Sequence, residues 1–202
     1  MLFWVGSTVA GTLVVGYSVR DDYISSLAGR GSPVAALGIA SILSLAGAHL
    51  AAARVLARGH RFLAGARLLL AASAATVVIA VSRVSCGSAA AGCGAVRSRG
   101  DTADLVHGLA VVAYELVVVA AMISVAAASL RGRRWPQWMA VVSVAAAAGS
   151  AVLLLRTDGT DPGLWQRLWV ATNLGWLLLA TWIGRPGQDP EPGGRTATSA
   201  AR

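Results

Sequence analysis

The chain has 202 residues, of which 56% are hydrophobic and only 13% are charged, whereas about 25% of the residues in a typical globular protein are charged. Its mean hydropathy is +0.65. The apolar residues form runs long enough to span a bilayer, which excludes a soluble globular core and a disordered chain and predicts an integral membrane protein. All 17 basic residues are arginines, and with 9 acidic residues they give a net charge of +8. They lie in short breaks between apolar runs and form no continuous basic face, so we expect no nucleic-acid partner.

A transmembrane helix requires about 20 mostly apolar residues. Six segments meet this requirement, which predicts an all-α, polytopic bundle of six transmembrane helices with short loops in one membrane domain over residues 1–185. The spans are expected at 2–19, 33–53, 62–82, 103–130, 137–155 and 163–184. Ser32-Pro33 and Asp161-Pro162 each place a capping side chain before a proline at a helix start. The chain after Arg185 is rich in Gly, Pro and polar residues, which predicts a disordered cytoplasmic tail over 186–202.

The first span lacks the basic start and the cleavage pattern of a signal peptide, and the segment that follows it, residues 16–27, is too polar to continue it. We interpret this segment as a short helix against the bundle. Asp22 and Ser25 are three residues apart and share a face of such a helix, so they are candidate ligand-binding residues. An ordinary capped turn at the interface explains the segment equally well.

Two histidines flank the end of the second span. His49 lies within it, toward the cytoplasmic end, and we expect a packing residue there and not a ligand. His60 lies in a basic loop, where we expect it to be solvated.

Cys86 and Cys93 flank a small flexible loop between the third and fourth spans. If this loop faces an oxidising compartment, the two cysteines can form a disulfide. A metal site is the alternative, but two sulfurs without a nearby histidine or a second pair support it weakly. We therefore expect no metal and no cofactor.

The fourth span carries three ionisable residues, namely Asp104, His107 and Glu115. They fall within an arc of about 80°, with Glu115 about 16 Å deeper than Asp104. Ionisable groups at membrane depth usually face the bundle interior and mark functional sites. The three are candidate catalytic residues, with His107 as the proton acceptor. Alternatively, Asp104 stabilises the helix start after a cap by Asp101 or Thr102, while His107 and Glu115 bond neighbouring helices.

The fifth span is rich in small residues, notably over 145–150, which favours close helix packing. The sixth contains Arg167 and Asn173 in an otherwise apolar run. Arg167 can snorkel outward, pair with Asp22 or Asp104, or clamp an anionic head group, so it is a candidate ligand-binding residue. Four tryptophans at predicted span ends are expected to anchor the helices in the membrane interface: Trp135, Trp138, Trp165 and Trp169.

Arginine density predicts the orientation. The second and fourth links contain dense arginines and no acid, namely Arg54, Arg58, Arg61, Arg67, Arg131, Arg133 and Arg134. The other three links also contain seven arginines, but these are dispersed among six aspartates. The positive-inside rule then places the second and fourth links, and both termini, in the cytoplasm. An all-arginine, Ala- and Gly-rich composition is typical of a GC-rich bacterial coding sequence, so we expect the bacterial plasma membrane.

Three stretches resemble the bacterial and archaeal six-span membrane proteins grouped as domain of unknown function 998. They are Gly16-Tyr17-Ser18 through Asp22-Tyr23-Ile24-Ser25-Ser26-Leu27, the loop leading to His107-Gly108, and Gly163-Leu164 through Arg167-Leu168 with Trp176. The resemblance covers about residues 5–184, and its departure is Ala28 where a glycine is expected. It implies a six-helix integral membrane protein with an outer-face pocket, and it implies no established reaction.

The favoured hypothesis is a protein that binds or handles a lipid or small amphiphile in an outward-facing polar pocket. The pocket is expected to be bordered by Asp22, Ser25, Asp104, His107 and Arg167, with Glu115 beneath. Three other hypotheses remain: a lipid-modifying enzyme with His107 as general base, a small proton-coupled carrier that uses Glu115 and His107, and an accessory or assembly subunit. The bilayer is the one partner common to all four.

Overall fold

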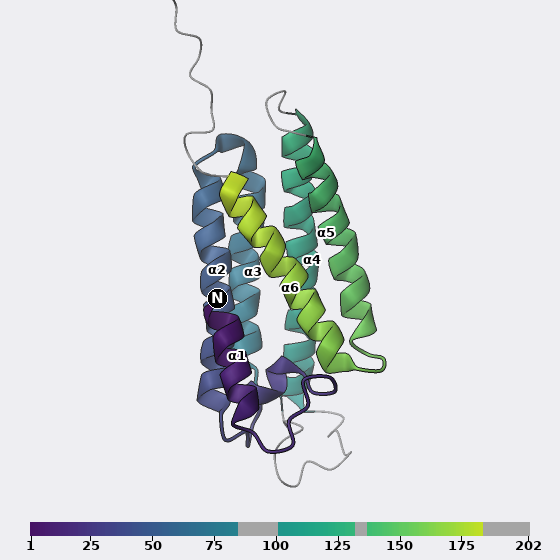
Figure 1. Ribbon diagram of the computed structural model, residues 1–202. Helices are drawn as coiled ribbons and strands as arrows, with labels where there is room; N and C mark the ends of the chain where they lie inside the picture. The colour runs from purple at the N-terminus through teal and green to yellow at the C-terminus, as the bar shows by residue number, and fades with distance from the viewer. Residues whose placement is uncertain (85–100, 132–136, 184–202) are drawn as a thin grey trace, which may run out of the picture.

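The computed structural model describes residues 1–84, 101–131 and 137–183 (Figure 1). The described part consists of helices and connecting turns, without strands, which confirms the all-α prediction. Its helices are α1 (Leu2–Thr12), the 3₁₀ helix η1 (Ile24–Ala28), α2 (Ala35–Ala57), the 3₁₀ helix η2 (His60–Phe62), α3 (Leu63–Val81), α4 (Thr102–Arg131), α5 (Trp138–Arg156) and α6 (Pro162–Ile183). The predicted Cys86–Cys93 disulfide, Trp135 and the predicted tail lie outside the described residues.

The long helices form a bundle in which each packs against its neighbour in sequence (Figure 1). Helix α6 crosses the bundle obliquely and packs against both α5 and α2, so it closes the ring of helices that begins at α2. Helix α1 packs against α2 and η1. The α2–α3 loop lies at one end of the bundle, whereas η1 and the α5–α6 turn lie at the other end.

Four segments are long and apolar enough to cross a membrane: Ala35–Ala57, His60–Val81, Thr102–Arg131 and Trp138–Arg156. The predicted first span over 2–19 was too long, because α1 ends at Thr12 and the chain turns at Gly16, where φ is +81°. Eleven helical residues cover about 16 Å, roughly half of a hydrocarbon core of about 30 Å. Helix α6 has 22 residues, but Gln166, Arg167 and Asn173 interrupt its apolar run.

The outer surface of the bundle is apolar and its interior contains polar groups. On α4, Leu105, Leu109 and Leu116 are exposed, whereas Ser150 and Asn173 are fully buried between helices. Water would favour the opposite arrangement, but in lipid the helices associate through close packing and interhelical hydrogen bonds. The four apolar segments and this distribution identify an integral membrane protein.

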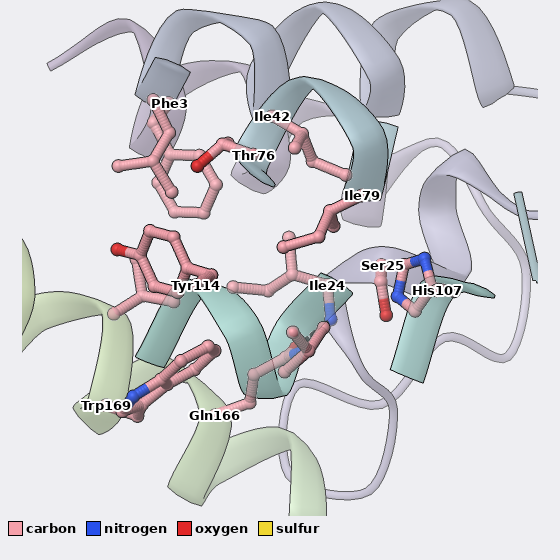
Figure 2. A pocket seen from close by; sticks show the side chains of 13 residues that line it. Phe3, Ile24, Ser25, Ile42, Thr76, Ile79, His107, Tyr114, Gln166 and Trp169 are labelled. Carbon is pink, nitrogen blue, oxygen red and sulfur yellow. Dashed lines mark hydrogen bonds between the residues drawn. The ribbon is translucent and has the colours of Figure 1, made fainter. Parts of the chain in front are cut away.

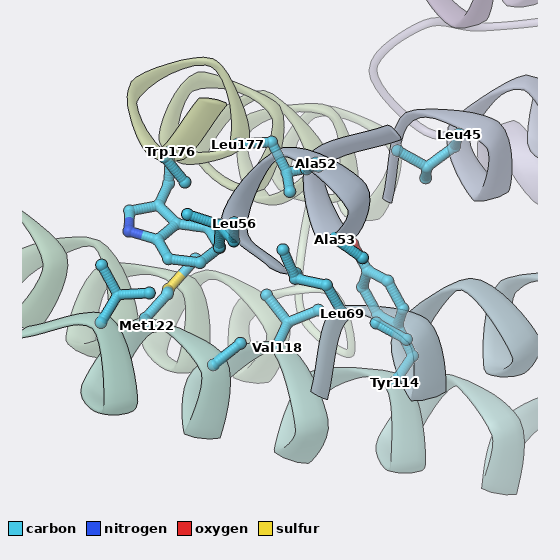
Figure 3. Packing of buried hydrophobic residues seen from close by; sticks show 14 of the residues in the cluster. Leu45, Ala52, Ala53, Leu56, Leu69, Tyr114, Val118, Met122, Trp176 and Leu177 are labelled. Atoms are coloured by element: carbon cyan, nitrogen blue, oxygen red, sulfur yellow. The ribbon is translucent and has the colours of Figure 1, made fainter. Parts of the chain in front are cut away.

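The apolar core lies among α2, α3, α4 and α6 (Figure 3). Leu56, Leu69, Met122 and Met139 are its largest fully buried apolar side chains, and Val118 and Trp176 pack beside Met122. This apolar layer holds α2, α3, α4 and α6 together beside the cavity of the candidate site.

Two glycines bring the segment after α1 against the bundle. A Cβ atom at Gly38 of α2 would lie 2.6 Å from the backbone nitrogen of Ala28 in η1. A Cβ atom at Gly163 of α6 would overlap the carbonyl oxygen of Asp22. Only glycine permits such backbone contacts, so these two positions seat η1 and the preceding turn on the end of the bundle.

Candidate functional site

A cavity of about 50 Å³ lies beneath η1, walled by α1, α2, α3, α4 and α6 (Figure 2). Its volume is enough for roughly three to five water molecules or a short piece of hydrocarbon chain. Most of its wall is apolar: Phe3, Ile24, Ile42, Leu45, Ile79, Val111 and Val170. Six polar or amphipathic side chains complete it: Ser25, Thr76, His107, Tyr114, Gln166 and Trp169.

Three of these six have their polar atoms bonded within the protein. The Thr76 hydroxyl donates to the carbonyl of Ala72 (2.8 Å), and the Tyr114 hydroxyl lies 3.2 Å from Nε2 of His49. The indole of Trp169 donates to Glu115 (2.9 Å). These groups are therefore occupied.

The other three present unpaired polar atoms. Within the described part of the chain, no hydrogen bond involves the Ser25 hydroxyl, Nε2 of His107 or the side-chain NH₂ of Gln166. The other amide atom of Gln166, Oε1, accepts from the backbone nitrogen of Ile24 (2.5 Å), which ties α6 to the start of η1. A donor, an acceptor and a hydroxyl are thus available at the wall of an otherwise apolar cavity.

The hydrogen bond of His107 selects its tautomer. Its Nδ1 lies 2.8 Å from the carbonyl oxygen of Ser82, just after α3. A carbonyl only accepts, so Nδ1 carries the proton and Nε2 keeps its lone pair in the neutral ring. At the start of α4, the Asp101 side chain accepts from the backbone nitrogen of Ala103 (3.0 Å), which confirms the Asp101 cap. Asp104 lies half-buried in the first turn of the same helix.

The Arg167 guanidinium holds the turn that precedes η1. Nη1 donates to the carbonyls of Val19 (2.7 Å) and Asp22 (3.0 Å), and Nη2 donates to the Tyr17 hydroxyl (2.5 Å). The Asp22 carboxylate instead accepts from the backbone nitrogen of Ser18 (2.7 Å). Burial raises the pKa of the Tyr17 hydroxyl, although the charge of Arg167 acts in the opposite direction. Arg167 and Asp22 therefore share contacts through the main chain and not through a carboxylate pair.

Glu115 does not line the cavity but bonds Trp169, which does, and it joins α4 to α5 and α6. It is 5% exposed, and its Oε2 accepts from Trp169 (2.9 Å) and Ser150 (3.0 Å). The Ser150 hydroxyl also lies 2.8 Å from Oδ1 of Asn173. His107 and Glu115 both face inward as predicted, but they bond different neighbours.

Of the six predicted site residues, the structure brings Ser25 and His107 together at the cavity. Four do not line it: Asp22, Asp104, Glu115 and Arg167. Trp169 was wrongly predicted as an interfacial anchor, since it is 5% exposed and hydrogen-bonded inside the bundle. His49 is confirmed as a satisfied packing residue, with Nδ1 2.8 Å from the carbonyl of Leu45.

Sequence reasoning missed Gln166, Tyr114 and Ser150. Gln166 precedes Arg167 in an apolar helix, so the criterion that selected Arg167 applies to it as well. Ser150 lies in a run of alanines and glycine and gave no such signal. Among the described residues, no group of three His, Cys, Asp or Glu side chains is placed to hold a metal ion.

Comparison with known proteins gives a family and no function. No curated protein and no solved structure matches the chain. The model of a family described as protein of unknown function (DUF998) matches residues 1–183, which is nearly the whole membrane bundle and confirms the resemblance seen in the sequence. The chain therefore belongs to the DUF998 family.

Proposed function

We propose that this protein binds a neutral lipid or small amphiphile in the cavity beneath η1. The observation that carries the proposal is the contrast within the cavity wall: apolar side chains over most of it, and unpaired polar atoms on Ser25, His107 and Gln166. The hydrocarbon chain of a lipid or amphiphile gains from contact with the apolar side chains of the wall. The three polar atoms are not among the fully buried atoms without a partner, so the head group of an amphiphile can reach them from the open side of the cavity.

The three polar atoms favour an uncharged head group. Gln166 offers an N–H donor, Nε2 of His107 offers an acceptor, and the Ser25 hydroxyl offers both. A hydroxyl or ester group complements this set. No arginine lines the cavity. The arginines that contact η1 and the turn before it, Arg83 and Arg167, already donate to main-chain carbonyls, so an anionic head group has no free cation at this wall. Asp22 and Arg167 then act as positioning residues for η1.

We further propose that the cavity end of the bundle faces outward in a bacterial plasma membrane. Three arginines at this end have partners within the protein: Arg20 bonds Asp161, Arg30 bonds Asp101, and Arg83 bonds the carbonyls of Ala28 and Gly29. Arg156, at the end of α5, is exposed and has no ion pair in the described residues. At the opposite end, exposed arginines have no ion pair in the described part of the chain: Arg54, Arg58, Arg61 and Arg131. Short loops dense in arginine are typical of the cytoplasmic side.

The test is retention of a defined probe, a short-chain monoacylglycerol, by protein in nanodiscs, measured by native mass spectrometry. The test variant is the double substitution Ser25→Ala, His107→Ala, and the matched control is His60→Ala, which removes an exposed histidine at the opposite end. We expect the wild type and the control to retain the probe and the folded double variant to lose it. Equal retention by all three proteins overturns the proposal.

The tautomer of His107 supports a second candidate function. With Nδ1 bonded to Ser82, Nε2 is the basic nitrogen, and it belongs to the same cavity wall as the Ser25 hydroxyl. A membrane-embedded enzyme that uses Nε2 as general base on a lipid ester fits this arrangement. The enzyme is supported if the protein hydrolyses the monoacylglycerol ester and if His107→Ala abolishes this turnover while His60→Ala retains it. Binding without turnover excludes the enzyme and agrees with a binding protein.

A further inference from the structure

The buried site around Glu115 has one hydrogen bond too few for its atoms. Oε1 of Glu115 and Nδ2 of Asn173 are both buried without a partner within the described structure. Glu115 is 5% exposed and Asn173 is fully buried. Unpaired polar atoms at this depth indicate that something small completes the site.

The cluster has fewer protons than its hydrogen bonds require. The Ser150 hydroxyl lies within hydrogen-bond distance of Oε2 of Glu115 and of Oδ1 of Asn173, but it has one proton and both atoms accept. If Glu115 is protonated on Oε2, it donates to Ser150, and Ser150 donates to Asn173. If instead the Asn173 amide is turned over, Nδ2 donates to Ser150, and two acceptors, Oε1 and the amide oxygen, are left bare. In both assignments, one proton added to Glu115 supplies a donor to a cluster that has more acceptors than protons.

The charges around the site favour the same conclusion. The helices α2 to α6 contain two acidic residues, Asp104 in the first turn of α4 and Glu115 deeper in the same helix. The groups that face it are uncharged: Ser150 on α5, Trp169 and Asn173 on α6, and Tyr114 beside it on α4. On α2, His49 is bonded through Nδ1 to a carbonyl and through Nε2 to Tyr114, as a neutral ring would be. A carboxylate without a cationic partner is costly in a bilayer, and a proton removes the charge.

We propose that Glu115, Ser150 and Asn173 form a proton-binding site at membrane depth, and that Trp169 couples this proton to the occupant of the cavity. Trp169 forms part of the cavity wall and also donates its indole N–H to Glu115. Loading transfers one proton from hydronium to the carboxylate, leaving water and a neutral acid; release reverses the transfer. The Trp169 bond is charge-assisted only when Glu115 is ionised, so a ligand that moves the indole favours the protonated form, and the coupling is reciprocal.

Infrared difference spectroscopy on the full chain in nanodiscs tests the proton site without any ligand. We expect a carbonyl band of a protonated carboxylic acid that shifts in D₂O, disappears in Glu115→Gln and remains in the matched control Asp161→Asn, which removes a carboxylate at the α5–α6 turn. Ser150→Ala and Trp169→Phe keep the carboxyl group and each removes one hydrogen-bond partner of Glu115, so each must shift the band. Absence of a Glu115-dependent band in folded protein overturns the proton site. Loss of the band when sodium ions are added also overturns it, because the site would then bind a metal cation in place of a proton.

The coupling rests on the proposed amphiphile function and is tested by adding the short-chain monoacylglycerol to the same sample. We expect the probe to shift the Glu115 band in the wild type and to leave it unmoved in Trp169→Phe. A probe that is retained without any shift overturns the coupling alone. A probe that is not retained, beside an intact band, overturns the proposed function and leaves the proton site standing.

Discussion

The contact between Gly38 and η1 gives a sharp prediction of stability. In Gly38→Ala, the added Cβ atom would lie 2.6 Å from the backbone of Leu27 and Ala28, and backbone atoms cannot rotate out of the way. Overpacking of this kind costs about 1–3 kcal/mol. Gly47 lies in the same helix, and a Cβ atom there meets nothing within 4 Å. The Gly-to-Ala gain in helix propensity, about 1 kcal/mol, is shared by both variants, so their difference isolates the clash.

Thermal unfolding in mild detergent, with fluorescence or circular dichroism as readout, measures this difference. We expect Gly47→Ala to be as stable as the wild type or more stable, and Gly38→Ala to be about 1–3 kcal/mol less stable than Gly47→Ala. Because η1 carries Ser25, Gly38→Ala should also weaken retention of the monoacylglycerol. Equal stability of the two variants would refute the reasoning that glycine is needed where η1 meets α2.

Three other predictions follow from individual contacts. Met122 is fully buried and Leu116 is 66% exposed, so Met122→Ala should cost about 2–5 kcal/mol in the same unfolding assay, whereas Leu116→Ala should cost little; similar losses would contradict the assigned core. Arg167→Gln should speed amide hydrogen exchange over residues 17–23, and the exposed Arg20→Gln should change it less; the reverse order would argue against Arg167 as the clamp. The hydrogen bond from Arg20 lowers the pKa of Asp161. The pair therefore stabilises the folded protein at pH values above the usual aspartate pKa of about 3.9, and this stabilisation is lost as the pH falls through the lowered pKa. The protection of the Leu164 amide, measured against its intrinsic exchange rate at each pH, should therefore fall at acidic pH in the wild type. The same fall in Asp161→Asn would exclude the pair as its cause.

The long helices were predictable because hydropathy and charged loops mark them directly. The predictions of 62–82 and 137–155 differ by one residue at each end from Leu63–Val81 and Trp138–Arg156. The first span failed because hydropathy does not distinguish an apolar helix from an apolar turn. Val14 lies after the end of α1, yet it is buried against Leu27 of η1, so it contributes hydrophobicity without extending the helix.

The candidate site was predictable where a polar residue interrupted an apolar run. His107 was found in this way, whereas Ser25 was selected in a polar segment because it shares a helix face with Asp22; both His107 and Ser25 line the cavity. Trp169 was assigned wrongly because its place near a predicted helix end resembled that of an interfacial anchor. In the structure α6 begins at Pro162, which puts Trp169 about two turns inside the helix. Its bond to Glu115 depends on the oblique packing of α6, which no local pattern in the sequence records.

Photoaffinity labelling tests the central claim, amphiphile binding in the cavity, most directly. The probe is a short-chain monoacylglycerol with a diazirine in its chain, and labelled peptides are identified by mass spectrometry. We predict labels on cavity-lining residues such as Ile24, Val111 and Val170 that are removed by excess unlabelled probe. Labels confined to lipid-facing residues such as Leu109 and Leu116, and insensitive to competition, would contradict the account.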